Sequence, residues 1–288
     1  MKVKNCTMTI KQADEDTEKL HTTEFPTNFV FLSDHSGFRR GEIHTLVSPK
    51  GAGKSTLIKT LALEMAENGK RVFILLSEET VDQYKLVIFK SALGTFGGNV
   101  IKTNEFMSNL FIASELEGEK KTPSELFSTF ESILVEYDID LFIYDNFTTG
   151  AFSQQLVSSQ GNASIDFKRS LIKYKYSALI VHHAAKGTNV YDSILDGDNV
   201  RGNATSVNMG SYNYLLSTFF KENPIRAFLI TDKARHHNKA NKKVYELSYN
   251  TVSGLYSSDR RSDYNVMQQI IIDRKRQGNT KRGEHVDF

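Results

Sequence analysis

Residues 46–57, which read LVSPKGAGKSTL, combine glycines, a lysine and hydroxyl groups in a spacing that can hold phosphate. The glycines let the backbone turn its N–H groups inward around an anion, Lys54 can neutralise the outer phosphates, and Ser55 can offer its hydroxyl to Mg²⁺. The usual pattern, G-x-x-x-x-G-K-[ST], begins with a glycine, and Ser48 is small enough to begin the bend instead. The sequence therefore predicts a nucleotide site for ATP and Mg²⁺, formed by Ser48, Pro49, Lys50, Gly51, Ala52, Gly53, Lys54, Ser55 and Thr56.

Acidic residues and histidines stand at the ends of three other apolar runs. Glu78 and Glu79 follow the first run, Asp145 ends the second, and His182 and His183 end the third. Because ligands of open parallel sheets bind beyond the carboxyl ends of the strands, we expect these side chains around the nucleotide. An acid can hold Mg²⁺, a carboxylate can orient or deprotonate the attacking water, and a polar donor can sense the γ-phosphate. Each residue also has a structural explanation, as a helix cap, a helix start or a solvated strand end.

Strand-like and helix-like segments alternate along the chain and would position these groups. The expected strands are 43–47, 71–76, 110–114, 140–145 and 178–183, and the expected helices include 54–69, 81–93 and 122–137. Fully apolar strands between helices predict an α/β fold with a parallel sheet covered on both faces. Three closely spaced runs at 212–218, 226–231 and 244–249 predict further strands, antiparallel, at the sheet edge.

Composition limits the class of protein. A chain of 288 residues fits one α/β domain with short tails, which we place at 1–24 (polar lead-in), 25–256 (nucleotide-binding domain) and 257–288 (basic tail). The net charge of +2 gives no overall attraction to nucleic acid, so any such site must be local. One cysteine, Cys6, fits a reducing compartment, and we find neither a membrane-length apolar run nor a signal-peptide core. We expect a soluble, cytoplasmic protein without membrane contacts.

With these motifs in view, the sequence resembles the RecA-like ATPases, particularly the hexameric DnaB-type helicases and the single-domain, plasmid-type RepA helicases. GEIHTLVSPKGAGKSTL resembles their phosphate loop, LLSEET their catalytic-glutamate strand, DLFIYDNF their Walker B strand and VHHAAKG their sensor strand. VRGNATSVNMGSYNYLL resembles the segment with a DNA-facing loop, and ITDKARHHNKANKKVYELSYN the Lys-x-Arg finger strand. The resemblance covers roughly residues 25–250. Gly210 and Ser211 stand where an acidic residue is common in the family.

The resemblance implies a RecA-like P-loop fold and a role for each matching residue. Lys54 and Ser55 would contact phosphate and Mg²⁺, and Asp145 would be the acid on the metal side. The catalytic base would be Glu78, with Glu79 as the competing choice, and the γ-phosphate sensor would be His183, with His182 as the competing choice. Lys233 and Arg235 would act on the nucleotide of a neighbouring subunit.

Residues 184–211 predict a DNA contact, because the segment is too long and polar for an ordinary connection. Lys186, Arg201 and Asn203 could hold phosphates of a single strand, and Gly202 would allow close backbone approach. The uncharged segment 148–164 is a second candidate. Both segments also fit ordinary solvated loops.

Three functional classes follow. The first, which the VHHAAKG and Lys-x-Arg matches favour, is an ATP-driven translocase or replicative-type helicase on single-stranded DNA. It would act as a homo-oligomer, as a hexameric ring, in contact with replication proteins. The second is a recombinase or mediator ATPase that coats DNA, and the third is a KaiC-like regulatory ATPase that acts on protein partners. Filaments would mark the second class, and hydrolysis that DNA does not stimulate would mark the third.

Overall fold

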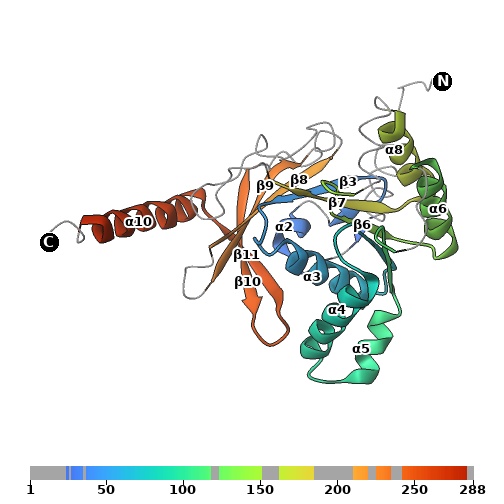
Figure 1. Ribbon diagram of the computed structural model, residues 1–288, viewed down its shortest axis with the longest axis horizontal. Helices are drawn as coiled ribbons and strands as arrows, with labels where there is room; N and C mark the ends of the chain where they lie inside the picture. The colour runs from blue at the N-terminus through green and yellow to red at the C-terminus, as the bar shows by residue number, and fades with distance from the viewer. Residues whose placement is uncertain are drawn as a thin grey trace, which may run out of the picture.

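A nine-stranded sheet forms the centre of the molecule (Figure 1). The computed structural model describes residues 24–25, 27–34, 37–117, 123–150, 162–184, 210–219, 225–234 and 242–283. The sheet has the order β11-β10-β9-β8-β3-β7-β6-β4-β5, and β1 (Glu24–Phe25) pairs separately with β2 (Phe38–Arg39). Its strands are β3 Ile43–Ser48, β4 Val72–Leu76, β5 Leu110–Ser114, β6 Leu141–Asp145, β7 Ser177–His183, β8 Tyr212–Phe219, β9 Arg226–Ala234, β10 Lys243–Asn250 and β11 Leu255–Ser262.

The sheet is parallel from β8 to β5 and antiparallel beyond β8. β3 pairs in parallel with both β7 and β8, and β6, β4 and β5 continue the same direction. β9, β10 and β11 each run antiparallel to the preceding strand. This confirms the predicted mostly parallel sheet with antiparallel edge strands.

Helices cover both faces of the sheet, as Figure 1 shows. They are α2 Val30–Ser33, α3 Lys54–Glu67, α4 Val81–Thr95, α5 Val100–Met107, α6 Pro123–Glu136, α8 Asn162–Tyr174 and α10 Tyr264–Gly283. α6 and α8 bury Phe130 and Phe167 against Phe142 of β6 on one face. Among the described residues, no helix is both long and apolar enough to cross a membrane.

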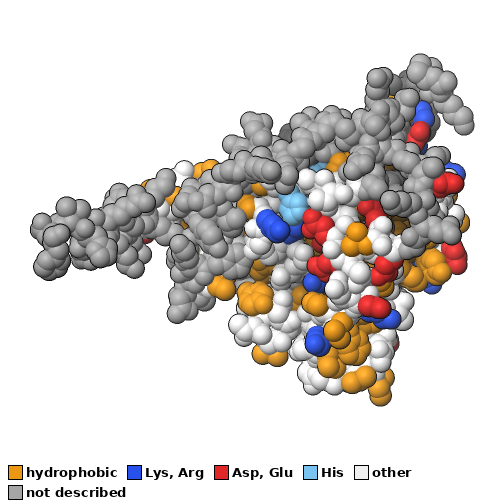
Figure 2. Space-filling model, in the orientation of Figure 1, with side chains coloured by type: hydrophobic (Ala, Val, Ile, Leu, Met, Phe, Trp, Pro, Cys, Tyr) orange, Lys and Arg blue, Asp and Glu red, His pale blue; other side chains and the backbone are white. Residues whose placement is uncertain are grey.

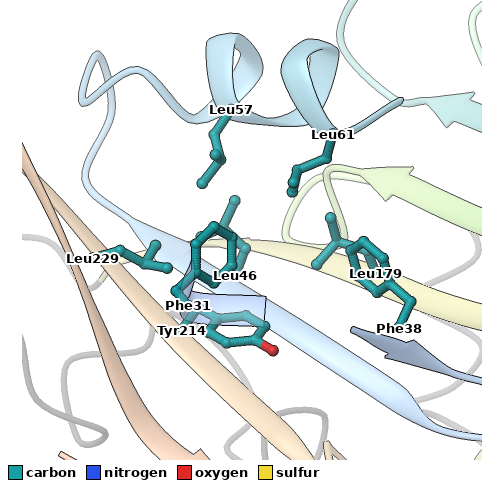
Figure 3. Close-up of a pocket in the computed structure, with 8 residues that line it drawn as sticks. All are labelled: Phe31, Phe38, Leu46, Leu57, Leu61, Leu179, Tyr214 and Leu229. Carbon is teal, nitrogen blue, oxygen red and sulfur yellow. The ribbon is translucent and has the colours of Figure 1, made fainter. Parts of the chain in front are cut away.

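The opposite face packs against α3, the helix that follows the phosphate loop. Figure 3 shows Leu57 and Leu61 of α3 facing Leu46 of β3 and Leu179 of β7, with aromatic side chains beside them. These eight side chains leave no room for a water molecule between them; the other four are Phe31, Phe38, Tyr214 and Leu229. Close packing of this kind holds the start of α3 firmly against the end of β3.

The sheet continues past residue 256, where we expected the domain to end. β11 pairs with β10 as far as Ser262, and α10 begins two residues later. Met267, Ile270 and Ile271 of α10 are buried against β8, β9 and β10, because they recur at helical spacing on one side of the helix. The first turns of α10, which lie within the segment that we expected to be a basic tail, therefore belong to the hydrophobic core.

Candidate active site

The phosphate loop joins the end of β3 to the start of α3. Gly51 and Gly53 have φ of 80° and 85°, a left-handed conformation that residues with a Cβ disfavour. Gly53 is also the N-cap of α3, so the loop leads directly into the helix at Lys54. The N-terminus of α3 therefore points its free N–H groups at the loop, which is an arrangement that binds anions.

The strand order brings the predicted polar residues together. β7, β6 and β4 lie successively beside β3, so the ends that carry His183, Asp145 and Glu78 are neighbours of the loop. The loop is tied to this row through the N–H of Ala184, which donates to the carbonyl of Ser48 at 2.9 Å. Figure 2 shows acidic, basic and histidine side chains side by side near the centre of one face of the molecule.

Ser55 and Asp145 form the oxygen pair expected of a magnesium site. The Ser55 hydroxyl donates to Asp145 Oδ2 at 3.5 Å. Burial raises the pKa of Asp145 to about 6, against the opposing charge of Lys54, which is itself only 8 % exposed. Hydroxyl and carboxylate oxygens suit Mg²⁺. No cluster of three His, Cys, Asp or Glu side chains among the described residues could hold a metal alone, so a cation here would also need phosphate oxygens.

Glu78 and His183 meet beside this pair. Glu78 Oε1 lies 3.5 Å from His183 Nε2 and accepts a hydrogen bond from Thr149 Oγ1 at 3.2 Å. Burial alone would raise the pKa of Glu78, but hydrogen bonds from Asn146, His183 and Thr149, with the charge of His183, hold that pKa below its ordinary value. The carboxyl is therefore ionised at neutral pH, as a general base must be.

The Asn146 amide links Glu78 to His183. Its Oδ1 accepts from the Thr149 N–H at 3.1 Å, which turns Nδ2 toward His183 Nε2 at 3.0 Å. The amide nitrogen has two protons and can donate to Glu78; it donates to His183 Nε2 only in the tautomer in which that nitrogen carries no proton, and His183 then does not donate to Glu78. Ser77 holds the Asn146 backbone, since its Oγ accepts from the Asn146 N–H at 2.9 Å. A substitution at one residue of this hydrogen-bond network therefore removes a partner from another residue.

The two histidines face different surroundings. His182 is 1 % exposed, with its ring 5.0 Å from that of Phe147, and burial lowers its pKa to about 3. Successive side chains of a strand point to opposite faces, so only one of the pair can reach Glu78. The geometry thus sets His183, and not His182, beside Glu78.

Glu79, the competing candidate for the base, has different neighbours from Glu78. Its backbone carbonyl accepts from Ser114 Oγ at 2.7 Å, and its charge acts on Lys59. Lys59 is buried on α3 with Nζ 4.9 Å from the ring centroid of Tyr84. Burial lowers the pKa of Lys59, while the charges of Glu79 and Asp145 raise it. Glu79 is half-buried, and its charge acts on Lys59 and Asp145.

Lys233 lies at the opposite end of the sheet from the phosphate loop. Its Nζ donates to the carbonyl of Gly210 at 2.9 Å. The next residue, Ala234, pairs with Tyr212, which pairs with His44 near the start of β3. Ser48 is four residues further along β3, which is about 13 Å at ~3.3 Å per residue. Lys233 is therefore remote from the phosphate loop of its own subunit.

The other predicted contacts lie outside the described residues. These are the finger residue Arg235 and the DNA-contact residues Lys186, Arg201, Gly202 and Asn203. Conversely, no pattern in the sequence marked Ser77, Asn146 or Thr149, which surround Glu78, as site residues. Only their place in the chain could have indicated a role at the site. Ser77 directly precedes the two glutamates, and Asn146 and Thr149 follow Asp145 at the end of β6.

Comparison with known proteins shows a similarity to a DNA repair protein. The chain is 27 % identical over 198 residues to the DNA repair protein RadA of Campylobacter jejuni, an alignment that covers 63 % of this chain. The chain spans only 39 % of the length of that relative. No protein-family model matches the sequence. The sheet order, the phosphate loop and this similarity together give the chain the fold of the RecA-like P-loop ATPases.

Proposed function

We propose that this chain is an ATP hydrolase that works as a ring of identical subunits and moves along single-stranded DNA. The observation that carries the proposal is the single row formed by the phosphate loop, Asp145, His183 and Glu78 at the ends of neighbouring strands. The row supplies an anion cradle, an oxygen pair for Mg²⁺ and an ionised base within one site. Hydrolysis of a phosphoanhydride needs all three.

Each side chain has one task in this proposal. Lys54 and the N–H groups at the start of α3 bind the phosphates, and Ser55 and Asp145 would hold Mg²⁺, which neutralises charge on the phosphate oxygens. Glu78 accepts the proton of the attacking water, because its carboxyl is ionised and half-exposed. Asn146 and His183 orient that carboxyl.

Exchanging each glutamate for glutamine separates the two candidates. We expect Glu78→Gln to reduce turnover by about 10²-fold or more with ATP binding intact, which is the usual scale for loss of a general base. Glu79→Gln, the matched control, is expected to keep most of its turnover, since Glu79 interacts with Lys59. Steady-state hydrolysis and a fluorescent-nucleotide titration on both variants are the measurements. An inactive Glu79→Gln protein that still binds ATP would reverse the assignment.

Single-stranded DNA is the proposed partner, through residues 184–211. The cations Lys186 and Arg201 in this segment can contact phosphates, and the similar RadA protein is named as a DNA repair protein. That name also favours a second candidate function, a recombinase or mediator ATPase that coats DNA without unwinding it. Both functions predict hydrolysis that depends on DNA.

Arg201→Ala tests the DNA contact. We expect weaker binding to single-stranded DNA, less DNA-stimulated hydrolysis and unchanged basal hydrolysis. Because one phosphate contact is lost, the salt dependence of binding should decrease by about 0.7 in log–log slope. Arg169→Ala removes an exposed arginine of α8 that pairs with Asp166, and it serves as the control for charge alone. Equal affinity and slope in Arg201→Ala and wild type would place the contact elsewhere.

One experiment decides among the functional classes. Hydrolysis is measured with and without single-stranded DNA, and the same samples are imaged by negative-stain electron microscopy. Stimulation with rings supports the translocase, and stimulation with filaments supports the recombinase or mediator. Hydrolysis that DNA leaves unchanged would reject both and favour an ATPase that acts on protein partners.

A further inference from the structure

A hydroxyl from β8 holds the backbone of the phosphate loop. Thr218 Oγ1 donates to the carbonyl of Ala52 at 2.6 Å, and both residues are buried. β8 is the parallel neighbour of β3, so its carboxyl end lies at the same end of the sheet as the loop. The loop is therefore tied to the strand on one side by a hydrogen bond that the GKS motif does not include.

A tyrosine from β11 lies beside this contact. A Cβ placed on Gly53 would have both Tyr256 Oη and Thr218 Oγ1 within 4 Å, so the two hydroxyl groups flank the same part of the loop. Thr218 has one hydroxyl proton and gives it to the Ala52 carbonyl. Burial raises the pKa of Tyr256 to about 12, so its hydroxyl stays protonated.

The same tyrosine packs against the last glycine of the loop. A Cβ placed on Gly53 would lie 2.7 Å from Tyr256 Oη, closer than two such atoms can approach. Gly53 also has φ of 85°. The site therefore requires glycine at 53 for two reasons, the backbone conformation and the approach of Tyr256.

The peptide bond between Ala52 and Gly53 links the Thr218 hydrogen bond to phosphate binding. In a trans peptide the C=O and N–H bonds point in opposite directions. Because Thr218 fixes the Ala52 carbonyl toward β8, it also turns the Gly53 N–H away from β8. Without that bond the peptide is freer to rotate, and the N–H loses part of its preorganisation for an anion.

We propose that Thr218 is a positioning residue for nucleotide binding, supported by Tyr256: it orients the Ala52–Gly53 peptide so that the Gly53 N–H faces the phosphates. This rests on the proposed function of the loop and adds residues from β8 and β11 to it. Neither residue lies in any of the sequence motifs that mark the nucleotide site.

The test is an equilibrium titration of the full chain with a fluorescent ADP. Thr218→Val keeps the shape but removes the hydroxyl, and we expect ADP to bind about three- to tenfold more weakly, the range for one net hydrogen bond. Thr218→Ser restores the hydroxyl and should bind within about twofold of wild type. Tyr256→Phe should shift affinity in the same direction as Thr218→Val, because it removes the hydroxyl that packs against Gly53.

Ser217→Ala is the matched control. Ser217 is the adjacent residue of β8, it is 2 % exposed, and its hydroxyl has no hydrogen-bond partner among the described residues. The Ser217→Ala variant should bind ADP as the wild-type protein does. Thermal unfolding without nucleotide is measured on every variant, since a structural role alone would lower the unfolding temperature and leave ADP affinity unchanged.

Three results would overturn the assignment of Thr218. The first is wild-type ADP affinity in Thr218→Val. The second is equal weakening in Thr218→Val and Thr218→Ser, which would implicate shape rather than the hydroxyl. If Thr218→Val does not fold, unchanged affinity in Tyr256→Phe is the third. Absence of ADP binding by the wild-type chain would instead reject the nucleotide site itself, so the two failures are distinguishable.

Discussion

Arg235→Ala is expected to reduce hydrolysis by about 10³–10⁵-fold, the range for an arginine supplied in trans to phosphoryl transfer. Arg235 follows Ala234 at the end of β9, and that end of β9 pairs with the start of β8, which in turn pairs with β3 near its start, away from the phosphate loop. We propose that Arg235 acts on the nucleotide of an adjoining subunit rather than on that of its own chain. Arginine suits the task, because its planar fork binds phosphate oxygens bidentately and stays charged.

Mixed oligomers test whether the finger acts between subunits. Arg235→Ala and Lys54→Ala should each be inactive alone, because they damage opposite sides of one interface. When the two variants are mixed, some interfaces combine an intact loop with an intact finger, and partial hydrolysis should return. Hydrolysis is measured across mixing ratios after subunit exchange has been verified by labelled chains.

The control for Arg235 is Arg260→Ala, an exposed arginine of β11 that shares Glu246 with Arg226. It should keep near wild-type hydrolysis. Full activity of Arg235→Ala on its own would end the finger hypothesis. If subunits exchange freely and no activity returns, either the finger acts within its own chain or the ring requires coordinated hydrolysis at every site.

Lys54→Ala is expected to reduce hydrolysis by at least about 10²–10³-fold, as for loss of one preorganised electrostatic contact in an active site. The phosphates lose their main cation. Lys54 also opposes the burial that raises the pKa of Asp145 to about 6, so without Lys54 this pKa rises and the carboxyl is partly protonated near neutral pH. The variant therefore loses both phosphate binding and part of the carboxylate charge that would hold Mg²⁺.

Steady-state hydrolysis and nucleotide titration are measured on Lys54→Ala and on Lys90→Ala, which removes an exposed lysine of α4. Only the first should lose activity. Raising the pH should restore part of the Mg²⁺ binding of the Lys54→Ala variant, since Asp145 ionises as the pH rises through its elevated pKa. Turnover near wild type in Lys54→Ala would contradict the nucleotide site altogether.

Local pattern was enough to predict the elements that carry the chemistry. The strand before the loop, the helix after it and the strands that end at Asp145 and His183 all formed where the apolar runs predicted them. These elements are specified by neighbours in the chain, through strand and helix periodicity and through the glycines of the loop. The loop motif likewise fixes its own spacing, so the candidate phosphate-binding residues could be named from the sequence.

What the sequence determined by itself, then, was the residue types at the strand ends and the class of fold; the tertiary structure decided which of them touch. Strand pairing set Glu78 against His183 and Asn146, and turned His182 into the core. It also brought Thr218 and Tyr256, more than 160 residues along the chain, onto the phosphate loop, and carried Lys233 to the far end of the sheet. The physical reason is that contacts between distant segments depend on sheet order and strand direction, which long-range packing selects and no local spacing encodes.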